Sequence, residues 1–234
     1  MPDNAVIVAL DYPTPELALQ FVNKIPAGAC ALKVGFELFL AGGPRLVEEL
    51  VARNFNVFLD LKFHDIPNTV AHACSVAAKL GVWMVNVHAS GGIEMMQVAR
   101  EAIDRESSSK RPNLIAVTVL TSINQKALSS IGIPGEVKHI VASWAGLAQQ
   151  AGLDGVVCSA QEAKLIRDQC NKEFMIVTPG IRLPSDNKDD QKRVVSPSDA
   201  FNAGATHIVV GRPITQAEDP CNALEIFRQA FIGA

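Results

Sequence analysis

The sequence is poor in aromatic residues and has no marked excess of charge of either sign. Aromatic residues make up 6% of the 234 positions, and 21 Lys and Arg stand against 24 Asp and Glu, which gives a net charge of −3. Such a balance provides no electrostatic footprint for nucleic acid or an anionic membrane, although it permits a local basic pocket. We therefore expect neither nucleic acid nor membrane as a partner.

Cysteine is scarce, and its spacing forms no metal or redox motif. The five cysteines are Cys30, Cys74, Cys158, Cys170 and Cys221. They include no C-x-x-C pair and have no histidine at zinc-site spacing, so we interpret them as reduced, buried small hydrophobic residues. The first four residues lack the basic region of a signal peptide, and no apolar run approaches the roughly 18 residues that span a bilayer. These absences predict a soluble, cytoplasmic protein.

The chain also lacks a linker, a low-complexity tract and a block of like charges. With 48% hydrophobic and 19% charged residues, its composition is that of a folded α/β protein and excludes a disordered, collagenous or disulfide-scaffold chain. The length allows one large domain or two small ones at roughly 150 residues per domain. Because nothing divides the sequence, we expect a single domain over residues 1–234.

Short apolar or β-branched runs recur along the whole chain. They lie at residues 5–10, 30–34, 56–61, 83–87, 114–120, 155–158, 174–178 and 207–211. The stretches between them can hold helices: from Ile66 to Leu80, apolar or small residues at 66, 70, 73, 77 and 80 mark one helix face. Runs that are apolar on both faces and alternate with helices indicate parallel strands covered by helices.

Eight such β/α units of about 29 residues each are close in size to a (β/α)8 barrel of roughly 250 residues. A doubly wound open sheet is the alternative. It is disfavoured because the first run is followed by Tyr12-Pro13-Thr14-Pro15, where a dinucleotide fold would have G-x-G-x-x-G. The sequence therefore predicts an α/β fold, a single-domain (β/α)8 TIM barrel, with the active site at the C-terminal ends of its strands.

The densest charged cluster follows the third run and contains Asp60, Lys62 and Asp65. Residues two apart on a strand point to the same side, so Asp60 and Lys62 are expected to project together into the barrel mouth. An opposite charge at ~4 Å contributes up to about 4 kcal/mol at an effective dielectric near 20, which holds such a lysine protonated. This predicts a proton donor, with a structural ion pair as the alternative; Asp65 could instead cap the helix that begins at Ile66.

Two arginine motifs follow the last two runs. Pro179-Gly180-Ile181-Arg182 comes after the seventh, and Gly211-Arg212 after the eighth. These loops form the usual phosphate site of such barrels, which predicts a phosphorylated substrate. The polar segment 180–193 is expected to be a lid that closes over the phosphate, with a solvated surface loop as the alternative.

Seven motifs together resemble one enzyme family. They are ALD at 9–11, LKVG at 32–35, DLKFHDIPNTV at 60–70, NVHASGG at 86–92, VTVLTS at 117–122, TPGIR at 178–182 and VVGRPIT at 209–215. The D-x-K-x-x-D element occurs in sibling barrels too, but in combination with FHDIPNT and TPGIR it is similar to the orotidine 5′-monophosphate decarboxylases of the bacterial type. The resemblance covers almost the whole chain.

The resemblance implies a charged network at the reacting end of the substrate. Asp11 and Lys33 would hold the ribose hydroxyls, with Lys33 also part of the network. Asp60 and Lys62 would form an alternating array around C6 of the pyrimidine. The implied catalytic residues are Lys62, Asp60, Asp65 and Lys33.

The resemblance also implies a homodimer in which two subunits share each site. Asp65, Ile66 and Thr69 would come from the second subunit, Thr121 would hydrogen-bond the pyrimidine, and Pro179 would pack on it. The phosphate would be bound by Arg182, Gln191, Gly211 and Arg212. The glutamine would arrive on the closed lid.

The implied activity is that of a carboxy-lyase. It converts orotidine 5′-monophosphate (OMP) to UMP and CO2, the last step of de novo pyrimidine synthesis, without metal or organic cofactor. One alternative is a magnesium-dependent sibling barrel, such as a 3-keto-gulonate-phosphate decarboxylase or a hexulose-phosphate synthase. Those enzymes need an acidic ligand at the end of strand two, where this chain has Lys33. A non-catalytic phosphate-binding barrel is the other alternative.

Overall fold

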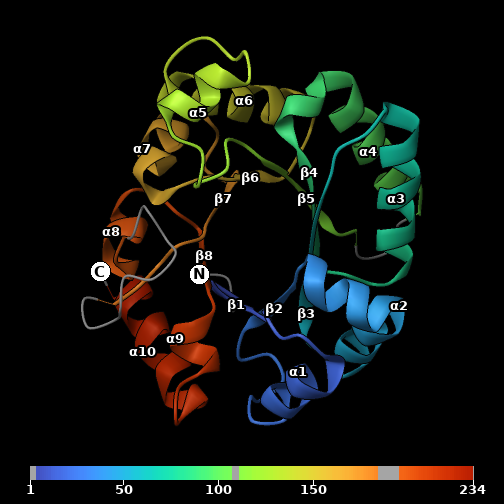
Figure 1. Ribbon diagram of the computed structural model, residues 1–234, viewed down its shortest axis with the longest axis vertical. Helices are drawn as coiled ribbons and strands as arrows, with labels where there is room; N and C mark the ends of the chain where they lie inside the picture. Colours follow the sequence, from blue (N-terminus) through green and yellow to red (C-terminus); the bar gives the residue numbers. More distant parts are fainter. Residues whose placement is uncertain (1–3, 107–110, 184–194, 234) are drawn as a thin grey trace.

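The computed structural model describes residues 4–106, 111–183 and 195–233. Eight parallel strands close into one barrel in sequence order, and the last pairs with the first (Figure 1). The strands are β1 (Val6–Ala9), β2 (Ala31–Val34), β3 (Asn56–Phe63), β4 (Met84–His88), β5 (Asn113–Val117), β6 (Gly155–Val157), β7 (Met175–Thr178) and β8 (His207–Val210). The predicted TIM barrel is confirmed.

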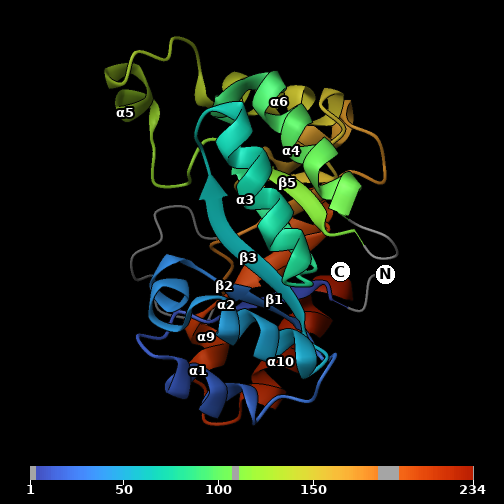
Figure 2. The same ribbon diagram turned by 90° about the vertical axis from the view of Figure 1, so that its right-hand side faces the viewer.

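Helices connect successive strands and cover the outside of the barrel; α3 and α4 lie side by side there (Figure 1, Figure 2). The helices are α1 (Pro15–Val22), α2 (Phe36–Ala52), α3 (Pro67–Lys79), the 3-10 turn η1 (Ala89–Gly91), α4 (Gly92–Glu106), α5 (Gln125–Ser130), α6 (Val137–Gln150), α7 (Ala160–Gln169), α8 (Pro197–Asn202), α9 (Arg212–Thr215) and α10 (Pro220–Ile232). Among the described residues, none of these helices is long and apolar enough to cross a membrane.

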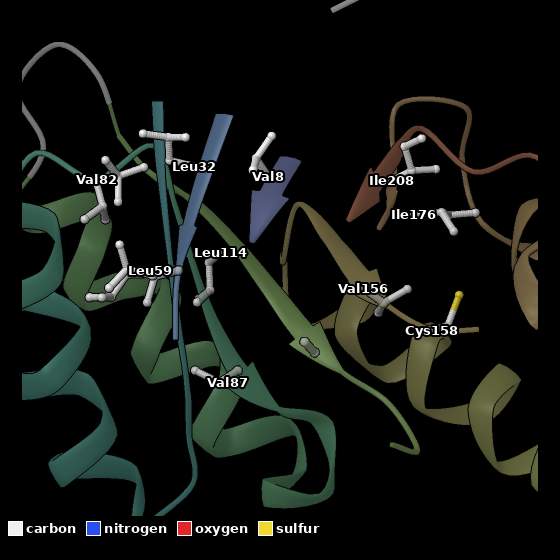
Figure 3. Close-up of a cluster of buried hydrophobic side chains, with 14 of the residues drawn as sticks. Val8, Leu32, Leu59, Val82, Val87, Leu114, Val156, Cys158, Ile176 and Ile208 are labelled. Carbon is white, nitrogen blue, oxygen red and sulfur yellow. The ribbon is translucent and has the colours of Figure 1, made fainter. Parts of the chain in front are cut away.

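The core has two layers, which explains why the strand sequences are apolar on both faces. The barrel interior holds one cluster, with Ile7, Phe58 and Val177 among its members. The other cluster lies between strands and helices and includes Val8 and Leu32 (Figure 3). Alternate residues of each strand therefore enter different apolar layers, as a barrel wrapped by helices requires.

Two expectations about local structure need correction. The run 114–120 is strand only to Val117, because the apolar residues beyond it, Val119 and Leu120, line a cavity instead of continuing the sheet. The expected helix face between 66 and 80 is wrong at its first position. Ile66 precedes α3 and is 68% exposed, while Val70 and Ala77 on that face are buried.

The cysteines are all free, and their burial follows the prediction only in part. Cys30, Cys74 and Cys158 are buried, Cys170 is half-buried, and Cys221 is exposed. Burial raises the pKa of the Cys30 and Cys74 thiols to about 12, so both remain protonated at neutral pH.

Candidate active site

A cavity of about 730 Å³ opens at the C-terminal ends of the strands. Parallel strands of a barrel all end at the same face, so residues at the ends of different strands meet there. The residues predicted for the site that line this cavity are Asp11, Lys33, Asp60, Lys62, Thr121, Pro179, Arg182, Gly211 and Arg212. Positions scattered over two hundred residues of sequence thus surround one space.

Three of the predicted residues that the structure describes do not line it. Asp65, Ile66 and Thr69 are exposed and lie outside the cavity wall. The Asp65 carboxylate accepts a hydrogen bond from the backbone N–H of Ile66 at 2.7 Å, at the entry to α3. Gln191 lies outside the described residues, as does most of the predicted lid at 180–193; of that segment, Gly180 and Arg182 line the cavity.

Charges of alternating sign cross the floor of the cavity. The Lys33 Nζ lies 3.4 Å from Asp11 Oδ1 and 3.3 Å from Asp60 Oδ2. The Lys62 Nζ lies 2.8 Å from Asp60 Oδ1. The row therefore runs Asp11, Lys33, Asp60, Lys62, and each interior member has an opposite charge on both sides.

Asp60 is the most enclosed member of this row, at 8% exposure. Burial alone would raise the pKa of its carboxyl, but Lys33 and Lys62, together with hydrogen bonds from Lys62 and Asn86, lower it below its ordinary value. Asp60 is therefore ionised at neutral pH. A fixed anion is held beside an ammonium group in a largely apolar enclosure.

Lys62 meets Asp60 by an irregular route. The backbone of Lys62 has φ 45°, which lies in the left-handed region that residues other than glycine rarely adopt. The ladder between β3 and β4 also shifts register between Leu59 and Phe63. The expectation that regular strand alternation aligns Asp60 and Lys62 is therefore wrong in mechanism, although the two side chains do meet.

An aromatic ring flanks the free end of Lys62. The Nζ lies 5.0 Å from the centroid of the Phe36 ring, within the range of a cation–π contact. Phe36 begins α2 and remains 55% exposed. The ammonium group is thus held between a carboxylate and a ring face at the edge of the cavity.

The cavity wall also carries two guanidinium groups. Arg182 follows β7 and is 9% exposed, and its Nη1 donates to the carbonyl of Ile181 at 2.9 Å. Arg212 is the first residue of α9, immediately after Gly211. The cavity therefore has a cationic part suited to an anionic group, in addition to the row of alternating charges.

Sequence reasoning missed several residues of the site. Tyr12 lines the cavity, and its hydroxyl donates to the Thr215 carbonyl at 3.2 Å. Val157 and Val209 form part of the apolar wall of the cavity, but nothing in the strand sequences around them distinguishes them from core residues. Asn86, wholly buried and bonded to Asp60, had a readable signal, because it is the one polar residue between the valines of its strand.

The donor set at the mouth is a poor one for a divalent cation. Among the described residues that line the cavity, the carboxylates are Asp11 and Asp60, and the Lys33 ammonium stands between them. Within the described ranges, no group of three or more His, Cys, Asp and Glu residues could hold a metal ion. The magnesium-dependent alternative calls for an acidic ligand at the end of strand two. In this structure β2 carries the positively charged Lys33 there.

Comparison with known proteins agrees over the full length. Residues 4–227 match the family model described as the orotidine 5′-phosphate decarboxylase / HUMPS family. The orotidine 5′-phosphate decarboxylase of Nitrosomonas eutropha is 52% identical over 234 residues, 100% of both chains, and that of Legionella pneumophila is 56% identical over 215 residues, 92% of this chain and 93% of its own. The crystal structure of the Lactobacillus acidophilus orotidine 5′-phosphate decarboxylase has a TM-score of 0.88 at 37% identity, covering 98% of this chain and 99% of that one. This chain belongs to the orotidine 5′-phosphate decarboxylase / HUMPS family.

Proposed function

We propose that the barrel mouth decarboxylates OMP to UMP and CO2 by electrostatic stabilisation, with Lys62 as the proton donor. The activity is that of a carboxy-lyase of pyrimidine biosynthesis, in keeping with the family and with relatives at 52% and 56% identity. The observation that carries the mechanism is the 2.8 Å pair of Lys62 and Asp60 in a row of alternating charges. We infer a cytoplasmic location from the free state of the cysteines.

The chemistry requires stabilisation of charge at a carbon that has no electron sink. When the bond from C6 to the carboxylate breaks, its electron pair stays in an in-plane orbital at C6, which the ring π-system cannot delocalise. The Lys62 ammonium stabilises this developing anion and then transfers a proton from Nζ to C6. CO2 leaves, and the resulting amine regains a proton from solvent.

Asp60 has two effects in this scheme. Its carboxylate fixes the Lys62 ammonium, and it disfavours the substrate carboxylate that is about to leave, so its interaction with the ligand improves as CO2 departs. Lys33 and Asp11 hold the ribose hydroxyls. Lys33 also anchors Asp60 from the other side, at 3.3 Å.

The remaining lining residues fit the other parts of OMP. Thr121 and Pro179 both line the cavity, and in this proposal Thr121 hydrogen-bonds the pyrimidine while Pro179 packs on it. Arg182, Gly211 and Arg212 form the phosphate site in the cationic part of the cavity. In this proposal Gln191 joins them when the segment 180–193 closes, so that phosphate binding assembles the charged array at C6.

We further propose that the protein acts as a homodimer with shared sites. Asp65, Ile66 and Thr69 are exposed and have no contact with their own cavity, which leaves them available to a partner's site. Phe36, which lies against Lys62, and Leu40, one helical turn further along α2, are 55% and 85% exposed. A second copy covering this face would remove that apolar surface from water.

The phosphate assignment is tested by comparing OMP with orotidine, which lacks the phosphate. The wild type should turn over OMP and be very poor with orotidine, because the binding energy that closes the lid is missing. A charge-assisted hydrogen bond is worth about 1.5–3 kcal/mol, so Arg212→Ala should lower kcat/KM for OMP by roughly 10- to 150-fold. Steady-state kinetics on both substrates measure this.

The control in that comparison is orotidine turnover by Arg212→Ala, which should be scarcely worse than that of the wild type. Equal damage to both substrates would mean that Arg212 supports the barrel mouth structurally, and the phosphate site would be misplaced. Tight binding of UMP without any turnover of OMP by the wild type would contradict the activity itself and favour a non-catalytic phosphate-binding barrel.

A further inference from the structure

The strand next to β3 carries a polar side chain that the mechanism above does not use. Asn86 lies in the middle of β4 between Val85 and Val87, and its exposure is 0%. Burying an amide in an apolar wall is unfavourable unless its donor and acceptor are both bonded. The contacts of this side chain therefore indicate why it is there.

Both ends of the amide bond to the charged pair. The Asn86 Nδ2 donates to Asp60 Oδ1 at 2.7 Å. Its Oδ1 accepts the backbone N–H of Lys62 at 2.8 Å. The same Asp60 oxygen receives the Lys62 Nζ at 2.8 Å. One side chain thus contacts the carboxylate and the backbone of the lysine that this carboxylate holds.

The sheet is irregular opposite Asn86. Leu59 pairs with Val85, and Phe63 pairs with Val87. Between these pairs β3 has three residues, whereas β4 has only Asn86. A bulge of this kind leaves backbone groups without partners in the ladder and redirects side chains. The asparagine oxygen takes the place of a ladder carbonyl for one of them.

The backbone of Lys62 needs such support. Its φ of 45° is a conformation that persists only when surrounding contacts enforce it. With the amide in place, the Lys62 N–H has an acceptor inside the barrel wall and the side chain leaves the strand toward Asp60. Without the amide, the half-buried Lys62 N–H would lose its acceptor, and the Asp60 carboxylate would lose the amide donor and keep only its lysine donors.

We propose that Asn86 is a positioning residue for the decarboxylation, which holds the Lys62 backbone in its bulge and orients the Asp60 carboxylate so that Nζ faces C6. Asn86 does not line the cavity and acts only through its hydrogen bonds to Asp60 and Lys62. This inference rests on the proposed function for its kinetic consequence. Its structural content stands on the two hydrogen bonds.

The first test is Asn86→Ala, with Asn113→Ala as the matched control. Asn113 begins the adjacent strand β5 at the opposite end of the barrel, where its Nδ2 donates to the Trp83 carbonyl at 3.2 Å. Loss of hydrogen bonds to charged groups predicts a fall in kcat of about 10- to 150-fold for Asn86→Ala, with KM for OMP and affinity for UMP little changed. The control should keep wild-type kcat.

The second test is the isosteric Asn86→Asp, which keeps the fold testable if the alanine variant does not fold. Its carboxylate still accepts the Lys62 N–H but faces Asp60, and two carboxylates this close resist joint ionisation. The charged and titratable groups around them are Lys33, Lys62 and His88. Burial lowers the pKa of His88, and the nearby His64 and Lys62 lower it further. Activity should be poor at neutral pH and recover on acidification, when a protonated Asp can donate to Asp60.

Three results would overturn the inference. They are wild-type kcat in folded Asn86→Ala, an equal loss of kcat and of UMP affinity, and a pH profile of Asn86→Asp that matches the wild type. A wild type that fails to turn over OMP would instead contradict the proposed function. Even then, NMR titration decides the positioning role, because loss of the amide should raise the pKa of the Asp60 carboxyl, and an unchanged titration would contradict it.

Discussion

Replacing Lys62 by alanine should reduce the turnover of OMP by at least the ~10²–10⁴-fold typical of a lost general acid, and further because a fixed charge is lost with it. The Lys62 Nζ lies 2.8 Å from Asp60 Oδ1, whereas the Lys33 Nζ lies 3.3 Å from Asp60 Oδ2 and also pairs with Asp11, so we do not expect Lys33 to replace it. The substitution leaves Arg182 and Arg212, the proposed phosphate ligands, unchanged. UMP should therefore still bind, and single-turnover kinetics should place the loss in the chemical step.

Two variants sharpen this result. Lys62→Arg keeps the positive charge, but its guanidinium does not give up a proton at neutral pH, so its activity should lie above that of Lys62→Ala and far below wild type. Lys164→Ala removes an exposed lysine that pairs with Asp168 on α7 and should leave turnover unchanged. If Lys62→Ala keeps more than about a tenth of wild-type turnover, Lys62 is not the donor.

Mixing two inactive variants should restore activity if the sites are shared. Asp65→Asn and Lys62→Ala, combined in equal amounts and allowed to exchange subunits, should give heterodimers with one site that has both native residues. Random exchange makes about half of the dimers mixed, so about a quarter of wild-type activity should reappear. The reason to expect this is that Asp65 is exposed and lies off its own cavity.

The control for that mixture is Lys62→Ala with Asp60→Asn. Both residues line the same cavity within one subunit, so every site of the mixed dimer lacks one of them and activity should stay absent. Persistent inactivity of the Asp65→Asn mixture, with exchange shown by differently tagged subunits, would return Asp65 to its own subunit. Its 2.7 Å bond from the Ile66 N–H would then be its role, at the entry to α3.

The barrel could be predicted from the sequence because the same local pattern, an apolar strand followed by a helix, is repeated along the chain. Each strand is apolar on both faces, since one face enters the barrel interior and the other packs under helices. The same regularity predicts which residues line the cavity, because they lie at the C-terminal ends of strands. Lys33 near the end of β2 and Arg212 just after β8 are examples. Parallel strands that end together bring their polar ends together.

The remainder depends on contacts between distant residues. The bulge at Lys62 is set by Asn86 on the next strand, and no pattern within β3 encodes a φ of 45°. Ile66 continues a helical apolar spacing yet is 68% exposed, because periodicity identifies a face without identifying what covers it. Val157, an ordinary strand valine in sequence, becomes cavity wall only when the barrel closes.

The central claim is that this charged row decarboxylates OMP without a cofactor. The most direct measurement is the absorbance change of OMP on addition of purified protein after exhaustive treatment with a chelator. We expect full turnover, unchanged when magnesium is returned, because Lys33, Asp60 and Lys62 supply the electrostatics themselves. Activity that disappears with the chelator and returns with magnesium would contradict the account and favour the metal-dependent sibling chemistry.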